Sequence, residues 1–142
     1  MAEIRGKDTQ PELFVRRFVH ACGFRFRLHV RELPGRPDMV LSKWGTCIFV
    51  NGCFWHSHRD CAYARVPSTR ASYWTDKLER NVARDAAVRA ELRRLGWRVI
   101  DIWECGIKDV RDPDLYWLAK AIRNTRQRRI VWPRKPTKPR LR

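Results

Sequence analysis

The sequence predicts an α/β fold in which helices flank a mixed central sheet. Residues 46–50 and 97–105 form apolar runs that are typical of central strands. A long helical pattern over residues 70–95 separates them, and a strand hairpin precedes the first run. A hairpin followed by a helical crossover is typical of a mixed sheet. A chain of 142 residues is expected to form one domain with a substantial core.

A helix start lies near the N-terminus. Thr9 is suited to cap the helix, Pro11 falls in its first turn, and Glu12 follows the cap by three residues. Apolar residues then recur at helical spacing, and Gly23 is a suitable end. A capping box alone would explain Glu12, so the local sequence requires no further role for it.

Three strands are expected after this helix, at residues 24–30, 38–41 and 46–50. The first alternates apolar and basic side chains, which indicates a half-buried strand whose basic face could meet phosphate. Asp38 stands where a turn enters the second strand, and a buried carboxylate is costly unless it is paired or bound to a metal. The alternative is an ordinary turn residue after Pro37.

The long helix is expected to end at Gly96. Lys77, Asn81 and Asp85 follow one another at four-residue steps and form a polar stripe on one face. The alternative is a solvated stripe in which Asp85 merely pairs with Arg89. The apolar face is expected to consist of Trp74, Leu78, Val82, Val88, Leu92 and Leu95.

A short amphipathic helix over residues 113–123 completes the predicted domain, residues 1–124. Residues 125–142 are rich in Arg, Lys and Pro, so we expect an extended or disordered basic tail. Such a tail could lie along a phosphate backbone.

Composition narrows the class of partner. The formal net charge is +16 and the pI is near 10.8, which indicates a polyanionic partner, with nucleic acid as the first candidate. No apolar run approaches the ~20 residues that cross a bilayer, and no segment resembles a signal peptide. We therefore expect a cytosolic protein with no membrane role.

Residues 52–61 hold two thiols, two imidazoles and two large aromatic side chains. Such polar groups would each need a partner in a core strand, so a site is the better interpretation. Five cysteines in a reducing compartment favour metal binding over disulfides, although Cys22 and Cys47 lie in apolar runs and are expected in the core. The alternative is ordinary reduced cysteines with an incidental histidine. The predicted structural zinc site consists of Cys53, His58, Cys61 and Cys105.

The Pro37-Asp38 pair resembles the first acidic motif of restriction-type nucleases. Those enzymes continue with an acid, a spacer and a lysine on the next strand, where this chain has Val50-Asn51-Gly52. This departure leads to a closer match, because the chain closely resembles the very-short-patch repair (Vsr) DNA mismatch endonucleases over residues 5–108. The resemblance is carried by Leu33-Pro34-Gly35-Arg36-Pro37-Asp38, Ile48-Phe49-Val50-Asn51-Gly52-Cys53-Phe54-Trp55-His56, Asn81-Val82 with Arg84-Asp85, Gly96-Trp97-Arg98-Val99, and Trp103-Glu104-Cys105.

The resemblance implies a restriction-endonuclease-like fold with a structural zinc site and a catalytic Mg²⁺. It implies an enzyme that recognises a T:G mismatch left by deamination of 5-methylcytosine and nicks the DNA strand 5′ to the mispaired thymine. The expected partner is double-stranded DNA with this mismatch, in the nucleoid of a bacterial cell. Other repair proteins are candidate partners, and we expect a monomer.

The resemblance also implies roles for individual residues. Asp38 would be the main Mg²⁺ ligand, and His56 would take the place of the missing catalytic lysine. Asp85 would orient His56, and Glu12 would assist at the metal directly or through water. Asn51 stands where many members of the family have histidine, and Asp60 lengthens the segment before the last cysteine of the loop. The aromatic residues that match those inserted into the DNA stack are Phe54, Trp55 and Trp74, and the matching zinc ligands are Cys53, His58, Cys61 and Cys105.

A zinc-stabilised DNA-binding module without catalysis would explain the charge, the aromatic residues and the cysteines equally well. It leaves unexplained the joint presence of four residues of catalytic type at the positions that the resemblance implies. Nicking is therefore the favoured function. The four residues are Glu12, Asp38, His56 and Asp85.

Overall fold

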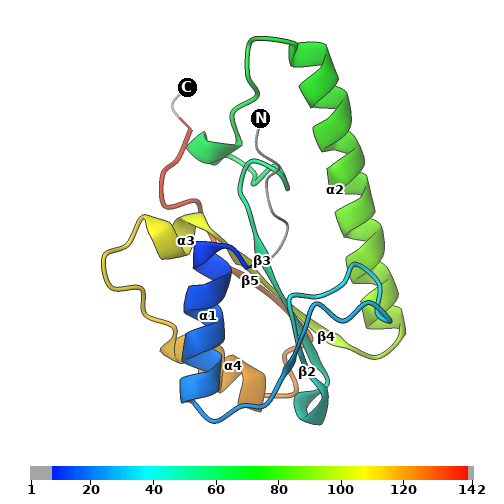
Figure 1. The fold of residues 1–142 in the computed structure, drawn as a ribbon, viewed down its shortest axis with the longest axis vertical. Helices are drawn as coiled ribbons and strands as arrows, with labels where there is room; N and C mark the ends of the chain where they lie inside the picture. Colours follow the sequence, from blue (N-terminus) through cyan, green and yellow to red (C-terminus); the bar gives the residue numbers. More distant parts are fainter. Residues whose placement is uncertain (1–7, 141–142) are drawn as a thin grey trace.

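A computed structural model describes residues 8–140 as a mixed sheet with helices on both faces (Figure 1). The strands are β1 (Arg27–Leu28), β2 (Met39–Leu41), β3 (Thr46–Asn51), β4 (Arg98–Trp103) and β5 (Arg129–Trp132). The α-helices are α1 (Gln10–Ala21), α2 (Ala71–Arg94), α3 (Cys105–Lys108) and α4 (Tyr116–Arg123). Two 3₁₀-helical turns are η1 (Ser42–Trp44) and η2 (Ala62–Ala64). The first residues of the family resemblance, 5–7, lie outside the described residues.

The strands are ordered along the sheet as they are along the chain, β1-β2-β3-β4-β5. The first two pairs are antiparallel, whereas β3–β4 and β4–β5 are parallel. The β3–β4 register aligns Thr46 with Arg98 and Asn51 with Trp103, so both strands end at the same edge. The predicted α/β fold with a mixed sheet is confirmed, and α2 is the crossover between the parallel strands β3 and β4.

Successive side chains on the strands enter two different cores. Ile48 packs in the cluster that contains Val15 of α1 and Leu118 of α4. Its neighbour Cys47 packs on the opposite face, in the cluster that contains Leu92 of α2. Each fully buried aliphatic side chain of this kind contributes about 1.5–3 kcal/mol. Among the helices of residues 8–140, none is both long and apolar enough to cross a bilayer.

The predicted ends of α1 are confirmed. Thr9 has an extended backbone, and its Oγ1 accepts a hydrogen bond from the Glu12 N–H at 3.3 Å. Gly23 has φ of +88°, a conformation that glycine adopts at little cost, and the chain leaves the helix there.

The strand expected over residues 24–30 is shorter in the structure. Only Arg27 and Leu28 form the β1 strand that pairs with β2, and both are exposed. His29 follows with φ of +48°, which ends the strand and leaves its imidazole beside Glu12.

The long helix is confirmed as α2, but its expected apolar face is only partly buried. Leu78 and Leu92 are buried, whereas Val82 and Leu95 are 45% and 48% exposed. The N-terminal part of α2 extends beyond the sheet (Figure 1), but this does not account for the pattern, because Leu78 lies nearer that end than Val82 and is buried, whereas Leu95 lies at the C-terminal end. The helical period predicts which residues share a face of the helix, but it does not indicate which of them the sheet covers.

The prediction of an extended or disordered tail is wrong for part of the C-terminal segment. Residues 129–132 form β5, which pairs in parallel with β4. Ile130 and Trp132 pack against the core under α1 and α4. Trp132 also lies against Gly106, where a Cβ would come within 2.6 Å of the indole ring. The burial of the four strand residues alternates, but their sequence, Arg-Ile-Val-Trp, does not alternate, and the surrounding basic residues and prolines indicate a tail.

Arg98 is a buried cation that is held by neutral oxygens. It is 2% exposed and donates to the carbonyls of Ala121, Ile122 and Asn124 at the end of α4. The last carbonyls of a helix lack intrahelical partners, so Arg98 satisfies them. It also donates to Thr46 Oγ1 at 2.7 Å, and its burial lowers the pKa of the guanidinium.

We predict that Arg98→Met lowers the free energy of unfolding by about 2–4 kcal/mol, because several buried oxygens lose their donor. Urea denaturation measures this change. The matched control Arg93→Met, at an exposed position of α2, should stay within about 0.5 kcal/mol of wild type. Equal stability of the two variants would show that the Arg98 bonds are dispensable.

Candidate active site

Asp38 and Glu12 form a buried acidic corner between α1 and β2. Asp38 is 8% exposed and its Oδ2 accepts the Val50 N–H at 2.7 Å, while Glu12 is 1% exposed. Burial, together with the charge of Glu12, raises the pKa of Asp38 to about 8. An ordinary turn residue would face water, so this environment favours a bound cation over the turn interpretation.

Glu12 does more than cap its helix. Its Oε1 accepts the Asp8 N–H at 2.9 Å, and its Oε2 lies 2.6 Å from Arg16 Nη2 and 2.7 Å from His29 Nε2. Arg16 also contacts Asp8 at 2.8 Å, so a guanidinium already neutralises this group of possible ligands. Because both Glu12 oxygens accept hydrogen bonds, water-mediated contact with a metal fits better than direct contact. His29 Nε2 lies 4.0 Å from Asp38 Oδ1 and links the two acids.

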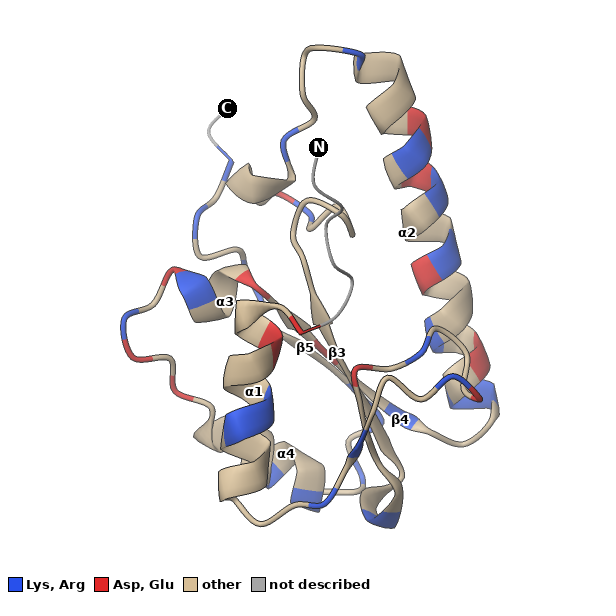
Figure 2. Ribbon diagram, viewed as in Figure 1, with Lys and Arg blue, Asp and Glu red and all other residues tan. Residues whose placement is uncertain are grey.

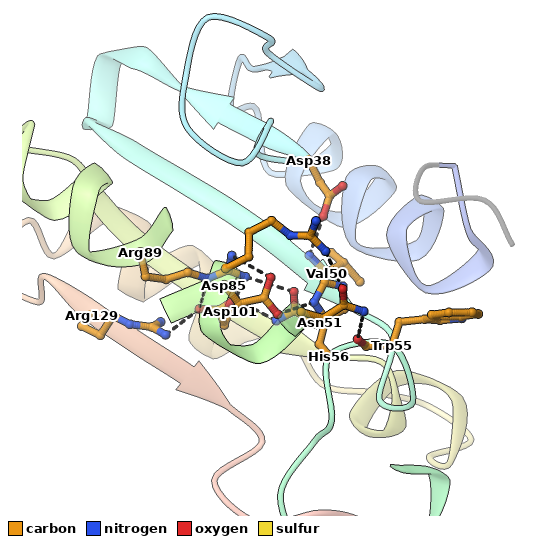
Figure 3. Close-up of polar contacts among 11 residues, drawn as sticks. Asp38, Val50, Asn51, Trp55, His56, Asp85, Arg89, Asp101 and Arg129 are labelled. Atoms are coloured by element: carbon orange, nitrogen blue, oxygen red, sulfur yellow. Dashed lines mark hydrogen bonds and ion pairs between the residues drawn. The ribbon is translucent and has the colours of Figure 1, made fainter. Parts of the chain in front are cut away.

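His56 and Asp85 form the second part of the site (Figure 3). His56 Nδ1 lies 2.6 Å from Asp85 Oδ2, whereas Arg89 Nη1 is 4.0 Å from Asp85 Oδ1. Asn81, one turn earlier on α2, donates to the Trp55 carbonyl at 3.0 Å. The expected polar stripe of α2 therefore faces the loop that carries His56, and the alternative of a merely solvated stripe is wrong for Asn81 and Asp85.

Asp38 and His56 line one cavity of about 440 Å³, with His29 and Asn51 on its walls. Carboxylate oxygen is the donor that Mg²⁺ prefers, and burial together with the charge of Glu12 outweighs the charge of Arg89 and raises the pKa of Asp38. The residues present therefore fit a Mg²⁺ ion at Asp38. An imidazole that faces the same cavity can exchange a proton with a reactant there.

The predicted zinc ligands lie together. All four side chains are buried, and their ligand atoms lie within 4.8 Å of one another. At Zn–S of about 2.3 Å and Zn–N of about 2.0–2.1 Å, tetrahedral geometry places S and N about 3.5 Å apart. His58 Nδ1 lies 3.4 Å from Cys53 Sγ and 3.6 Å from Cys105 Sγ, which fits a structural zinc site. Cys47 is buried in the core and Cys22 packs against it, as predicted.

The loop that carries three of the predicted zinc ligands is tied to the C-terminal segment and to β4. The Ala62 N–H donates to the Lys138 carbonyl, and the Arg140 N–H donates to the Asp60 carbonyl, each at 2.9 Å. The His58 ring stacks on Trp103 with centroids 4.1 Å apart. The loop therefore has a fixed place at the end of the sheet.

Phe54, Trp55 and Trp74 form one aromatic cluster between this loop and the start of α2. Their ring centroids lie 5.0–5.7 Å apart in edge-to-face contacts. The cluster is partly exposed, so Trp74 is not a buried helix residue. Trp55 and Phe54 also line a cavity of about 750 Å³ together with His56.

Comparisons with known proteins agree with this geometry. The family model of the DNA mismatch endonuclease Vsr matches residues 1–63. A type II nicking enzyme of Xanthomonas oryzae is 44% identical over 110 residues, which cover 78% of this chain and 80% of that protein. The DNA mismatch endonuclease Vsr of Escherichia coli is 40% identical over 108 residues, which cover 76% of this chain and 69% of that protein. The chain belongs to the Vsr DNA mismatch endonuclease family.

A type II nicking enzyme of Neisseria meningitidis extends the similarity, with 37% identity over 131 residues that cover 92% of this chain and 86% of that protein. This Vsr-family protein is a DNA-nicking endonuclease, and DNA is its substrate. The alternative of a DNA-binding module without catalysis does not fit this membership. The family has a restriction-endonuclease-like fold, in agreement with the mixed sheet.

The sequence does not indicate several of the residues at the candidate site. His29 was assigned to the basic face of a strand, and Arg89 was considered only as a partner of Asp85. Asp101 lies in an apolar strand run, and Arg129 lies in the expected tail. A charged residue within an apolar run is a usable signal, because it needs a buried partner. The other three positions carry no local signal.

We predict that the purified protein contains one zinc per chain and that Cys105→Ser destabilises it by more than ~2 kcal/mol relative to Cys22→Ser. The reason is that Cys105 links the loop to the end of β4, whereas Cys22 lies outside the cluster. Elemental analysis and thermal unfolding measure the two quantities. If the purified protein contains no zinc and a chelator does not lower its melting temperature, the four residues do not form a structural zinc site.

We also predict that Asp38→Asn raises the melting temperature in magnesium-free buffer near neutral pH by a few °C, corresponding to about 1 kcal/mol or more. The folded protein retains a proton up to pH about 8 that the unfolded chain releases near its ordinary pKa of 3.8. The contribution of Asp38 to the free energy of unfolding is therefore greatest below about pH 4, and it is lost as the pH rises toward 8.

Thermal unfolding across this pH range tests the sign. The advantage of Asp38→Asn should grow from pH 4 to pH 8, while the exposed control Asp76→Asn should show no such trend. An advantage that is independent of pH would contradict a buried ionisable Asp38.

Proposed function

We propose that this Vsr-family enzyme acts in very-short-patch repair. It recognises the T:G mismatch left by deamination of 5-methylcytosine and nicks the DNA strand 5′ to the mispaired thymine by Mg²⁺-dependent hydrolysis. The observation that carries the proposal is the common cavity of Asp38 and His56 beside a partly exposed aromatic cluster. Hydrolysis and distortion of the duplex can then occur at one place.

The proposed chemistry uses four residues of the chain. Mg²⁺ held by Asp38 would neutralise charge on the scissile phosphate and the leaving 3′ oxygen. His56 directs Nδ1 to Asp85, which leaves Nε2 as the acceptor for a proton from the attacking water. Asp85 fixes the orientation of the imidazole, and Glu12 assists at the metal through water and His29. The zinc cluster supplies four protein ligands and so leaves no position for a reacting water.

Mismatch recognition is assigned to the aromatic cluster. Basic side chains occur on α2, on the loop before it and near the C-terminus (Figure 2), and this charge favours any duplex. Discrimination therefore has to come from another feature. A T:G pair is more easily unstacked than a matched pair, so Phe54, Trp55 and Trp74 would insert there at a smaller cost.

The names of the relatives set the scope of this proposal. One is a DNA mismatch endonuclease, and two are type II nicking enzymes. Two of these names state nicking, and the third states a mismatch and endonuclease activity. The test therefore compares T:G and matched duplexes directly.

We predict that the wild-type protein with Mg²⁺ nicks a labelled T:G duplex on the 5′ side of the thymine and leaves a matched duplex intact. Asp38→Ala should abolish nicking while DNA affinity stays within a few-fold, and His56→Ala should slow it at least ~100-fold. His20→Ala, at an exposed position of α1, is the matched control and should be fully active. Cleavage of both duplexes alike would overturn the T:G assignment, and an active Asp38→Ala would overturn the metal site.

We predict that Trp55→Ala, and more weakly Trp74→Ala, narrows the affinity gap between T:G and matched duplexes by ~1–3 kcal/mol, as for a lost stacking platform. The salt dependence of non-specific binding should not change, because no phosphate contact is removed. Fluorescence anisotropy at several salt concentrations measures both quantities. Tyr116→Ala, which removes an aromatic residue that is 73% exposed on α4, should leave the gap intact. If both tryptophan variants retain the preference, recognition resides in groove contacts.

A further inference from the structure

A third cavity adjoins the His56–Asp85 pair, and Asp38 does not line it. It has a volume of about 220 Å³, and Arg89, Asp101 and Arg129 line it together with the pair. Figure 3 shows these side chains converging from α2, β4 and β5. The proposed mechanism gives none of the three a role, although they adjoin the proposed base.

Asp101 is the centre of this network. It is 3% exposed and lies 2.5 Å from Arg89 Nη2 and 2.6 Å from Arg129 Nη2. Asn51 Nδ2 also donates to Asp101 Oδ1 at 2.7 Å, and Arg89 donates to Asn51 Oδ1 at 3.1 Å. Burial opposes ionisation of Asp101, but the hydrogen bonds and charge of Arg89 and the charge of Arg129 lower its pKa. The network is therefore an ionic one with fixed geometry.

Arg89 has little freedom to move. Its guanidinium lies over the Phe49 ring, with Cζ 3.7 Å from the ring centroid, and hydrogen bonds to Asp101 and Asn51 hold its edge. A planar guanidinium that is stacked and bonded in this way keeps a single orientation. Its Nη1 is consequently held toward Asp85.

The two oxygens of Asp85 have different partners. Oδ2 lies 2.6 Å from His56 Nδ1, and Oδ1 faces Arg89 Nη1 at 4.0 Å. Two guanidinium groups share the single carboxylate of Asp101, so one positive charge remains in excess on this side of Asp85. That charge attracts Oδ1 across 4.0 Å and so favours the orientation of the carboxylate in which Oδ2 holds His56.

We infer that Arg89, Asp101 and Arg129 are positioning residues for the Asp85–His56 pair, so that strand β5 contributes to strand nicking without touching DNA. The inference rests on the proposed role of His56 as the base. The competing explanation is that the network only stabilises the sheet. The two explanations differ in what happens when the charges are replaced by apolar side chains of similar size.

The decisive variant is Arg89→Met/Asp101→Leu. Apolar replacement of a buried ion pair often preserves stability, but Asn51 and Arg129 also lose their partner Asp101, so urea denaturation first establishes that the variant folds. Positioning should nevertheless be lost, and the single-turnover rate of T:G nicking should fall by about 10- to 100-fold while affinity for the duplex stays within about threefold. The downfield proton resonance of His56 Nδ1–H in the free protein should disappear or broaden. A wild-type rate and resonance in this variant would overturn the inference.

Arg129→Gln is a milder second variant for the case in which the double variant does not fold. It removes one partner of Asp101 at a side chain that is 32% exposed, and it should slow nicking by about 3- to 10-fold and broaden the same resonance. The matched control is Arg128→Gln, which removes the same charge one residue earlier from a side chain that bonds to the Gly96 carbonyl. Equal nicking rates and equal His56 Nδ1–H resonances in the two glutamine variants would contradict the inference.

The resonance separates this inference from the proposed function, because it is recorded without DNA or Mg²⁺. If wild type fails to nick T:G duplexes and the variants still lose the resonance, the network stands and the proposed function fails. If wild type nicks and both the resonance and the rate survive in the variants, the proposed function stands and the network is only structural.

Discussion

The parallel pairing of β3 with β4 is the constraint on which the candidate site depends. In this register Asn51 lies opposite Trp103, so both strands end at one edge of the sheet. Two residues beyond each strand, Cys53 and Cys105 meet in the metal cluster. Parallel neighbours need a crossover connection, and α2 both supplies it and carries Asp85 to the same edge. One topological feature therefore assembles the zinc cluster and the His56–Asp85 pair.

The acidic corner is the part of the fold that works against stability. Asp38 is buried beside Glu12, and its raised pKa reflects the cost of ionising it there without a cation. Such a cost is typical of a site that is shaped for a charged ligand. The remainder of the fold offsets it through two apolar cores, a buried cysteine and histidine cluster, and the bonds from Arg98 to the end of α4.

The sequence by itself determined the features that local physics encodes. Capping residues and helical period predicted α1 and α2, and apolar runs predicted β2, β3 and β4. Donor chemistry and close spacing predicted that Cys53, His58 and Cys61 form a metal site, and the place of Cys105 at the end of a later apolar strand made it the fourth candidate ligand. Asp38 and His56 were selected mainly by the family resemblance, since a lone turn aspartate and a lone imidazole are common in any chain.

Tertiary structure alone decided which polar groups meet. Asp101 and Arg129 belong to neighbouring strands that are aligned only by the β4–β5 register, and β5 was hidden in a segment whose composition indicated a tail. His29 reaches Glu12 because the chain reverses at a positive φ, which no periodicity reports. Arg89 turns from a surface partner into a buried one because α2 packs on the sheet at that turn. Local sequence patterns determine which face of an element is apolar, whereas contacts between residues far apart in the chain depend on strand register and helix placement, which only the complete fold fixes.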